Sequence, residues 1–587
     1  MRWYNHENAR EYEKSSDVFH GRNYNPVSWA QMKAISLVFS LLIATTVAFA
    51  QIDEARQAIE RREYVRAVSI LSAALADRPS PDVYLYLGIA YRSMREYQKA
   101  EDIFNEGGNR YPDDPRFHLE LANLFIENND IDAAKSEFRR ALSVDPDNSY
   151  ASDRLATIDM SEGDVQSALR SWNKSDRPHI NDILHNYNLH FGSWVVRRGV
   201  AFHPAGTLYY RDWKLTENRL LETENFSNVG LEIEPTIVPD LYNAVVRTTR
   251  KTNLPSNIAF DLLKGAPVQI SYLNFWNIGN SGVNFNGDYR WQASRRRAEG
   301  QFKVPLPIAG LLHLELGDTW RLEQWDVSDL VRPELQPLAR FRYDANALRI
   351  GVKHIPHYRV EIGAGFEYRN RAVNGELPGL FDSLNTGTFM GEASVRIADG
   401  GIYQNRLRLE GFAARPSIIG DLKFTGAVGE LNNRITLSKD DEAYFDWSLK
   451  GGSARGALPI DEYFILGIDT RPKNLLRGHI SFRHGSYGQS PMGTDFVLLN
   501  TDVERRMRTL PFFNALNIPF VTLKWELFFD VAKTWDRNDI FLPSGLLLDT
   551  GAGLRFETPT HSFNVSYGRS LRNGQNVLWG YYERRLW

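Results

Sequence analysis

Hydrophobic and polar positions alternate over short segments in the C-terminal part of the chain. Between Leu523 and Val531 every second residue is apolar, whereas the residues between them include Lys524, Glu526 and Asp530. A period of two is typical of β-strands, because successive side chains point to opposite faces. One fully apolar face opposed to a polar one favours the wall of a membrane β-barrel, with lipid outside and water inside.

Segments of this kind recur roughly every 15 to 25 residues from residue 259 to the C-terminus, separated by turns rich in Gly, Asn, Asp and Pro. At about 20 residues per strand, residues 259–587 predict an antiparallel barrel of about 16 strands. We expect the basic run Arg295–Arg297 and the glycine-rich run Gly451–Gly456 to form turns. Two soluble β-sandwiches are the alternative architecture for this region.

The last predicted strand, Val577–Trp587, ends on an aromatic residue with no tail beyond it. Arg585 stands two positions before the end, where barrels of this kind prefer an apolar residue. Two explanations stay open. Arg585 reaches the membrane interface with its charged end, or the strand that closes the barrel is short and weakly paired.

Residues 51–175 show a helical pattern with a repeat, because Pro81–Asp114 and Pro115–Asn148 align with a period of 34 residues. This pattern resembles the tetratricopeptide repeat, in which small residues let two helices approach and aromatic residues fill the gaps. The predicted packing residues are Gly88, Tyr91, Ala100, Phe104, Ala122, Phe125, Ala134 and Phe138. The repeats predict a helical solenoid that binds a partner, with a helical spacer that binds nothing as the alternative.

The N-terminus carries the pattern of an export signal. Residues 32–50 begin with Met32 and Lys33, continue as an apolar run and end with Ala48 and Ala50 in an A-x-A arrangement. These features predict a secretory signal peptide cleaved after Ala50; a membrane-spanning helix is the alternative, but the run is shorter than the roughly 20 residues that a bilayer requires. Residues 1–31 make an unusual leader, and we therefore expect translation to begin at Met32.

Between the repeats and the barrel, residues 190–254 predict a small α+β domain. The pattern indicates a strand at Ser193–Val200, a helix at Trp213–Glu224, and strands at Gly230–Glu234 and Tyr242–Thr249. The helix and the last two strands resemble the second half of a POTRA module, whereas the first half departs from that pattern. The resemblance implies a periplasmic module that binds extended chains at a sheet edge; a generic linker domain is the alternative.

Two short motifs lie near the C-terminus. Leu476–His479 (LRGH) resembles the [VI]RG[FY] signature of the BamA/TamA outer-membrane assembly superfamily, the bacterial surface antigen type of barrel. Phe528–Ala532 (FFDVA) resembles the F-x-D-x-G strand motif of that superfamily, with Ala532 in place of the final glycine. Phe464–Gly467 and Glu504 are similarly placed, so several elements occur in the expected order.

The resemblance implies a loop folded into the barrel lumen and held there by Arg477. Its expected partner is Asp530, with Glu504 as a second partner, because a buried guanidinium requires a carboxylate that matches its planar fork of donors. Gly478 would let the backbone turn tightly beside the charge, and Phe528 belongs to the same strand motif as Asp530. The alternative is an ordinary glycine turn with a surface arginine.

Composition removes several classes of function. The chain contains no cysteine, and its net charge is −3, which gives no indication of nucleic-acid binding. Aromatic residues make up 12% of the chain, as the interfacial girdles of a membrane barrel require, and the mean hydropathy of −0.40 argues against a helical membrane protein. The histidines lack metal-ligand spacing and no nucleophile motif occurs. We expect no enzyme activity, no cofactor and no metal.

Together these patterns predict a multidomain protein of the outer membrane of a Gram-negative bacterium, with its repeat and POTRA-like domains in the periplasm. The resemblance implies a factor that inserts client polypeptides into the outer membrane or exports them through it. Its expected partners are outer-membrane lipid, unfolded or extended clients, and a periplasmic protein bound by the repeats. A surface-lipoprotein translocator and a passive outer-membrane pore are the alternatives.

Overall fold

The structure is a computed structural model that describes residues 51–584 except for several short segments. The chain divides into two compact units, residues 1–158 and 159–587, which are described separately. The predicted signal peptide with Ala48 and Ala50, and the C-terminal Arg585 and Trp587, lie outside the described residues. The other segments outside them are 186–191, 239, 256–257, 260–261, 263–268, 309, 328–338, 377–383, 401, 417–418, 439–441, 468–474, 480–481, 484–485, 488–489, 512–519, 539–543 and 558–560.

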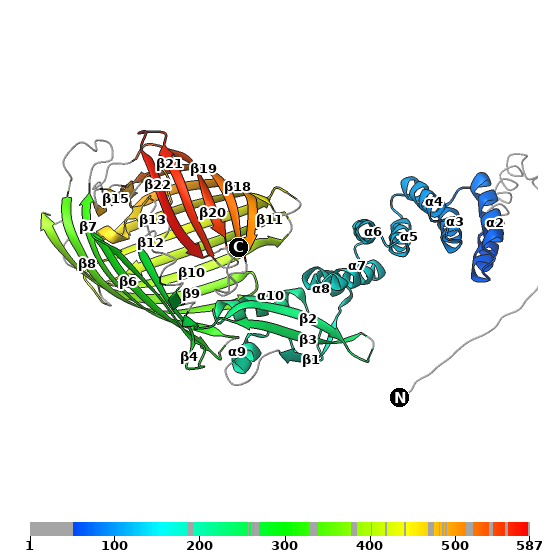
Figure 1. Ribbon diagram of the computed structural model, residues 1–587, viewed down its shortest axis with the longest axis horizontal. Coiled ribbons are helices and arrows are strands. Elements are labelled where there is room, and N and C mark those ends of the chain that lie inside the picture. The colour runs from blue at the N-terminus through cyan, green and yellow to red at the C-terminus, as the bar shows by residue number, and fades with distance from the viewer. Residues whose placement is uncertain are drawn as a thin grey trace, which may run out of the picture. The chain divides into compact units, whose positions relative to one another are not determined.

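The first unit is a series of helices joined by short turns (Figure 1). After a helix at residues 51–60 come α2 (Tyr64–Asp77), α3 (Pro81–Ser93), α4 (Tyr97–Arg110), α5 (Arg116–Glu127), α6 (Ile131–Val144) and α7 (Ser149–Ser161). In the described part of the chain, no helix combines the length and apolar character needed to cross a bilayer.

Small residues set the spacing of these helices, as the sequence predicts. A β-carbon on Gly88 would lie 2.3 Å from the ring of Phe104, and one on Gly107 would lie 2.4 Å from the ring of Phe117. The remaining predicted packing positions are fully buried, or pack against the buried residues, at Ala100, Ala122, Ala134, Phe138, Tyr91 and Phe125. The helices approach closely because the glycine and alanine positions carry no larger side chain, and the aromatic residues fill the remaining space.

The second unit begins at Asp159, near the end of α7, and therefore includes the last repeat helix. The helix α8 (Val165–Trp172) packs against the α+β domain that follows, and the ring centroids of Trp172 and Tyr242 are 5.6 Å apart. Asn173 holds the same junction, because its amide donates to the carbonyl of Leu208 (2.9 Å). The repeat pattern therefore runs to about residue 175, but its final helix belongs structurally to the next unit.

The α+β domain contains β1 (His179–His185), α9 (Gly192–Gly199), α10 (Tyr210–Glu222), β2 (Phe226–Pro235) and β3 (Leu241–Arg250). Its sheet has the order β1-β3-β2, with β1 parallel and β2 antiparallel to β3. Both β1 and β2 are edge strands.

Two predictions about this domain are wrong. The domain does not start at residue 190, because β1 belongs to its sheet. The segment Ser193–Val200 is not a strand but lies in α9: Val195, Val196 and Gly199 are buried while Arg197 and Arg198 are exposed, and this spacing is helical. Adjacent valines suggested a strand, yet their burial on one side favours the helix.

Fifteen strands of the described chain form one closed antiparallel wall, in agreement with the predicted barrel (Figure 1). They are β4 (Ile270–Ile278), β5 (Val283–Gln292), β6 (Arg295–Leu306), β7 (Leu312–Val327), β8 (Ala339–His357), β9 (Val360–Glu376), β10 (Leu384–Gly400), β11 (Tyr403–Ala414), β12 (Phe424–Thr436), β13 (Ala443–Gly456), β18 (Asp495–Pro511), β19 (Phe520–Trp535), β20 (Leu547–Glu557), β21 (His561–Ser570) and β22 (Asn576–Arg584).

The wall closes with β22 as the neighbour of β4. Fifteen successively antiparallel strands make β4 and β22 run in the same direction, whereas fully antiparallel closure requires an even number. Within the described residues, the other neighbouring wall strands share residue registers, some of them shifted at β-bulges, but no residue register joins β22 to β4.

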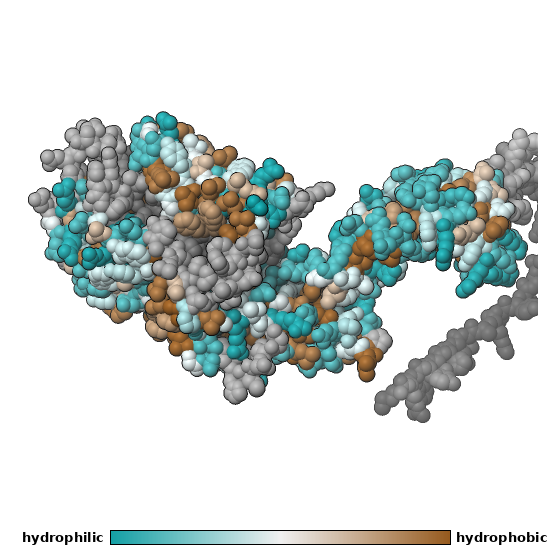
Figure 2. Space-filling view, in the orientation of Figure 1, coloured by the Kyte–Doolittle hydropathy of each residue, from teal (hydrophilic) through white to brown (hydrophobic). Residues whose placement is uncertain are grey.

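Side chains of the wall separate by polarity. On β19, Leu527 and Phe529 are 52% and 41% exposed on the outside, whereas Lys524, Glu526 and Asp530 are buried inside. Figure 2 shows hydrophobic residues gathered on the visible outer surface of the wall. The predicted alternation is therefore confirmed, with charges directed into the lumen.

The two predicted turns in this region are strand instead. Arg295–Arg297 begins β6, and Gly451–Gly456 ends β13. Only residues 293–294 connect β5 to β6, so the basic run is already within the ladder, and Arg295 is buried. Glycines in Gly451–Gly456 pair with β12, where local composition alone indicated a turn.

Candidate functional site

The long connection between β13 and β18 folds into the lumen of the barrel. Its described residues form a short helix, η3 (Ile460–Glu462), and the strand β14 (Phe464–Ile465), which pairs with β17 (Met492–Gly493). We call residues 457–494 the lumen loop. Its apolar side chains share one buried cluster with residues from β7, β8, β12, β18, β19 and β20, and strands so far apart in the wall meet only in the interior.

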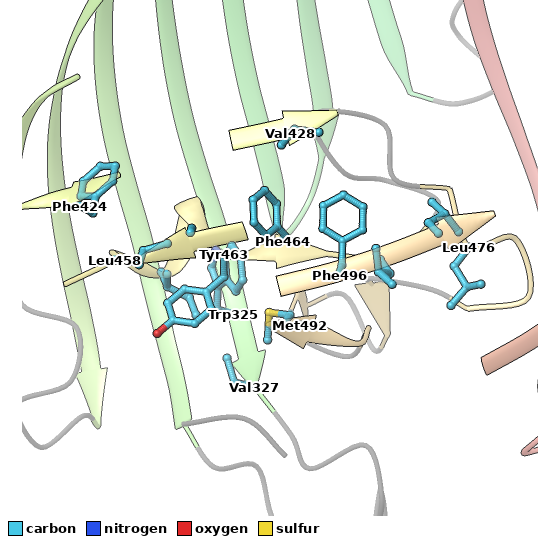
Figure 3. Close-up of a cluster of buried hydrophobic side chains, with 14 of the residues drawn as sticks. Trp325, Val327, Phe424, Val428, Leu458, Tyr463, Phe464, Leu476, Met492 and Phe496 are labelled. Atoms are coloured by element: carbon cyan, nitrogen blue, oxygen red, sulfur yellow. The ribbon is translucent and has the colours of Figure 1, made fainter. Parts of the chain in front are cut away.

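This cluster forms a hydrophobic core inside the barrel (Figure 3). Phe464 of the loop lies against Phe496 of β18, with ring centroids 4.8 Å apart, and Trp325 stacks on Phe341 at 5.8 Å. Leu476, directly before Arg477, is fully buried. Burial of each such side chain contributes about 1.5–3 kcal/mol, so packing holds the loop in place as well as charge.

Arg477 forms a bidentate ion pair with Asp530 of β19. Its Nε donates to Oδ2 at 2.9 Å and its Nη2 donates to Oδ1 at 2.6 Å. The backbone N–H of Arg477 donates to the same carboxylate at 3.0 Å. Both residues are buried, with exposures of 6% and 0%, so the predicted partnership is present and shielded from bulk water.

Neighbouring residues complete the environment of this ion pair. The Arg477 guanidinium carbon lies 4.0 Å from the ring centroid of Phe528, which gives the first residue of the F-x-D motif a cation–π contact. The backbone N–H of Gly478 donates to Asp549 of β20, and His479 Nδ1 lies 3.0 Å from the same carboxylate. Ala532 is buried in the hydrophobic core.

Gly478 lies in a tight turn as predicted, closed by the N–H of His479, which donates to the carbonyl of Leu476 at 3.1 Å, and glycine is also needed there for space. A β-carbon there would lie 2.5 Å from Asp549 Cγ and 2.7 Å from the backbone nitrogen of Ser570. Gly568 makes a similar allowance, since a β-carbon there would lie 2.2 Å from the carbonyl oxygen of Arg477. The two glycines let the loop backbone lie directly on the wall.

Glu504 is not the second partner of Arg477, and this prediction is wrong. The second carboxylate is Asp502, which pairs with Arg477 Nη1. Asn500 faces Asp530 in the register, and Glu504 lies four residues further along β18, or about 13 Å. Glu504 instead pairs with Arg555 and lies 3.7 Å from Lys524. The sequence motif placed an acid on the correct strand and on its lumen face, but two residues away from the position that contacts Arg477.

A second charged anchor, which the sequence reasoning missed, holds the beginning of the lumen loop. Asp461 is fully shielded, and Arg371 of β9 donates to it through Nε at 2.8 Å. Tyr343 of β8 donates to the same carboxylate at 2.7 Å, and Arg369 also pairs with it. The available signal was Arg369 and Arg371 at alternate positions of one strand, which places both on the same face.

The lumen keeps an open, charged cavity of about 680 Å³ beside the loop. Among its lining residues are Arg297, Glu299, Glu367, Glu392, Arg408 and Glu462. In the part of the chain that the structure describes, no group of His, Cys, Asp or Glu could hold a metal ion.

The opposite end of the barrel is in contact with α10. Asn218 donates to the carbonyl of Tyr358 at 2.8 Å, in the turn between β8 and β9, and Asn225 donates to the carbonyl of Gly282 at 3.1 Å, in the turn between β4 and β5. Arg219 donates to the carbonyl of Ile355 at 3.1 Å. The α+β domain is therefore fixed to the ends of several wall strands.

Glu222 makes charged contacts across this interface, beside Glu224, which lies 3.6 Å from Lys303. Glu222 pairs with Lys303 of β6 and lies 3.5 Å from Lys353 of β8. Burial alone would raise the pKa of Glu222, but the two ammonium groups outweigh it and lower the pKa to about 2. The carboxylate therefore stays ionised at neutral pH.

Fold and loop define the class of protein: a closed antiparallel barrel with an inward-folded loop, preceded by an α+β domain and helical repeats. Models of the tetratricopeptide repeat match residues 58–124 and 115–148, so these residues carry tetratricopeptide repeats as predicted.

Among solved structures, the chain is similar to BamA from Haemophilus ducreyi lacking POTRA domains 1–3, with 10% identity, a TM-score of 0.42, and coverage of 70% of this chain and 84% of that chain. It is also similar to CdiB from Escherichia coli, with 13% identity, a TM-score of 0.48, and coverage of 75% and 86%. Both TM-scores lie below 0.5, so the fold is assigned from the strand order and registers of this chain. No curated protein matches its sequence.

Proposed function

We propose that this protein is an outer-membrane barrel that inserts client polypeptides into the membrane or exports them through it, in the manner of the BamA/TamA superfamily. The observation that carries the proposal is the buried Arg477–Asp530 ion pair. It joins the two motifs that resemble that superfamily, although they lie 53 residues apart, and it does so inside the lumen.

The physical basis would be strand templating. An incoming chain cannot enter lipid with unsatisfied backbone groups, so it must pair with something on the way. The seam between β22 and β4 has no residue register within the described residues. Strand edges that separate at this seam would expose unpaired backbone groups and accept a further strand, and the seam is therefore the proposed position of the client.

Periplasmic parts would deliver the client. The edge strands β1 and β2 suit the addition of an extended segment, which is how a POTRA-like domain would act. The tetratricopeptide repeats would hold a partner protein or part of the client. No step of the proposed activity requires a cofactor or a catalytic residue.

A passive pore is the second candidate, and the charged lumen cavity of about 680 Å³ is the observation that favours it. A pore would conduct ions steadily in planar bilayers and would bind no polypeptide at its seam. The lumen loop argues for a different main role, because it fills part of the channel.

Photocrosslinking in cells separates the two candidates. A photoreactive residue at Leu578 of β22, which is 75% exposed near the seam, should give adducts with other polypeptides. The matched control is Leu348 of β8, which is 64% exposed but far from the seam in the strand order. Equal adducts at both positions, or none at Leu578 alongside steady conductance of the purified protein, would count against client handling.

A further inference from the structure

A small cavity of about 130 Å³ lies between α10 and the inner wall of the barrel. Asn218 and Glu222 line it from α10, Arg359 and Glu361 from the β8–β9 turn and the start of β9, Arg396 from β10 and Arg406 from β11. It is separate from the lumen loop, which contacts the other ends of these strands. Three guanidinium groups converge on a space of only a few atoms.

The carboxylates of this cavity already have partners. Glu222 pairs with Lys303 and lies 3.5 Å from Lys353, and Glu361 pairs with Lys353. Two acids are thus matched by two lysines. Within the described residues, neither acid forms an ion pair with Arg396 or Arg406.

Arg406 carries the strongest indication of a missing ligand. Its Nε is buried without a hydrogen-bond partner, and within the described residues its guanidinium makes no ion pair. Within the described residues, the guanidinium of Arg396 donates only to the neutral side-chain oxygen of Asn218, at 3.4 Å. A buried N–H donor without an acceptor costs free energy, and a planar fork of donors is suited to an oxyanion.

Arg408 shows the contrast on the same strand and the same face. It lies 3.1 Å from Glu392 and 2.8 Å from Glu410, so its charge is matched within the chain. The wall therefore pairs its lumen arginines where acids are available, and Arg406 is an exception at the rim next to α10.

We propose that this cavity is a binding site for one compact oxyanion, a phosphate or a carboxylate group, held by Arg406 and Arg396. The inference goes beyond client handling and does not depend on it. Because Asn218 of α10 contacts Arg396, a bound anion would also strengthen the attachment of the α+β domain to the barrel.

Binding is tested by isothermal titration calorimetry on the full-length protein in detergent micelles, at constant ionic strength, with inorganic phosphate as the probe. We expect saturable binding to the wild type and binding at least about tenfold weaker to Arg406→Gln, because a charge-assisted hydrogen bond is lost. Arg408→Gln is the matched control and should bind like the wild type. Absence of phosphate and carboxylate binding to the wild type, or equal binding by Arg406→Gln, would overturn the proposal.

Two further measurements separate a ligand site from a structural role and identify the source of the anion. In chloride alone, Arg406→Gln should melt at the same temperature as the wild type or higher, since an unmatched charge is removed; a clear drop would mean that Arg406 supports the fold and would overturn the site. A short peptide with a free C-terminal carboxylate is then compared with its amidated form. Binding of the free form alone assigns the site to polypeptide termini, and binding of inorganic phosphate alone assigns it to small phosphates.

Discussion

Arg477 and Asp530 meet through two nearly parallel hydrogen bonds, of 2.9 and 2.6 Å, in the interior of the barrel. The backbone N–H of Arg477 adds a third bond to the same carboxylate. A guanidinium and a carboxylate in this arrangement satisfy each other, but removal of one leaves the other charged and buried. The pair therefore fixes the position of the lumen loop more strictly than packing alone.

The Arg477→Ala substitution should destabilise the loop by about 3–5 kcal/mol, because Asp530 and Asp502 lose their counter-charge. The expected result is loss of the compact, heat-modifiable band on unheated gels, together with loss of client export. Arg506→Ala is the control, on the strand that carries Asp502: Arg506 pairs with Glu442 at 2.9 Å, but its side chain is 36% exposed, so about 1 kcal/mol or less should be lost. Wild-type behaviour of Arg477→Ala would contradict the role of this ion pair.

A double-mutant cycle distinguishes Asp502 from Glu504 as a partner of Arg477. Arg477→Ala combined with Asp502→Asn should be strongly non-additive, since Asp502 pairs directly with the guanidinium. Arg477→Ala combined with Glu504→Gln should be additive to within about 0.5 kcal/mol, because Glu504 pairs with Arg555 and Lys524 instead. Unfolding free energies in detergent provide the measurement, and strong coupling to Glu504 would favour the sequence-based prediction over the observed geometry.

Asp461→Asn should release the beginning of the lumen loop while leaving the Arg477 end in place. The change removes the charge that Arg369 and Arg371 share, so those arginines repel each other and the loop opens more often. Hydrogen exchange at residues 457–467 should rise, whereas exchange at 475–479 should change little. Glu462→Gln is the milder control, because Glu462 makes fewer of these contacts and is 20% exposed. An equal rise at both loop ends would mean that the anchors do not act separately.

Attachment of α10 to the barrel should weaken at low pH through Glu222. The pKa of this carboxyl falls from 4.5 to about 2 in the folded protein, so its contribution, roughly 3 kcal/mol, is fully present above about pH 4.5 and is lost as the pH falls towards 2. The titratable groups that face Glu222 are Lys303, Lys353 and His313. Exchange of α10 amides, measured between pH 6 and pH 2.5, should increase across this interval.

Glu222→Gln should remove most of that pH dependence and weaken the attachment at neutral pH as well. Glu217→Gln is the matched control on the same helix, because Glu217 pairs with Lys214 of α10 rather than with the barrel. If both variants keep the wild-type pH profile, the electrostatic attachment through Glu222 does not exist.

Local sequence patterns predicted much of this architecture because they reflect local physical requirements. The alternation around Leu527 and Phe529 set which face of β19 is apolar, and the spacing of Gly88 and Phe104 reflects the closest approach of two helices. The short segment Ser193–Val200 is the instructive failure, since two adjacent valines fit a strand and a helix equally well until burial decides between them.

By itself, the sequence determined the order of the parts: repeats, an α+β domain, and a wall of alternating strands. It also indicated that a loop between two of these strands carries an arginine. Only the tertiary structure decided which charges meet. Selection of Asp502 over Glu504 depends on strand register, and the anchor at Asp461 depends on side chains about 90 residues away in the chain. Periodicity in the sequence assigns a residue to one face of a strand. Its partner depends on strand register and on the path of the loop, and long-range packing determines both.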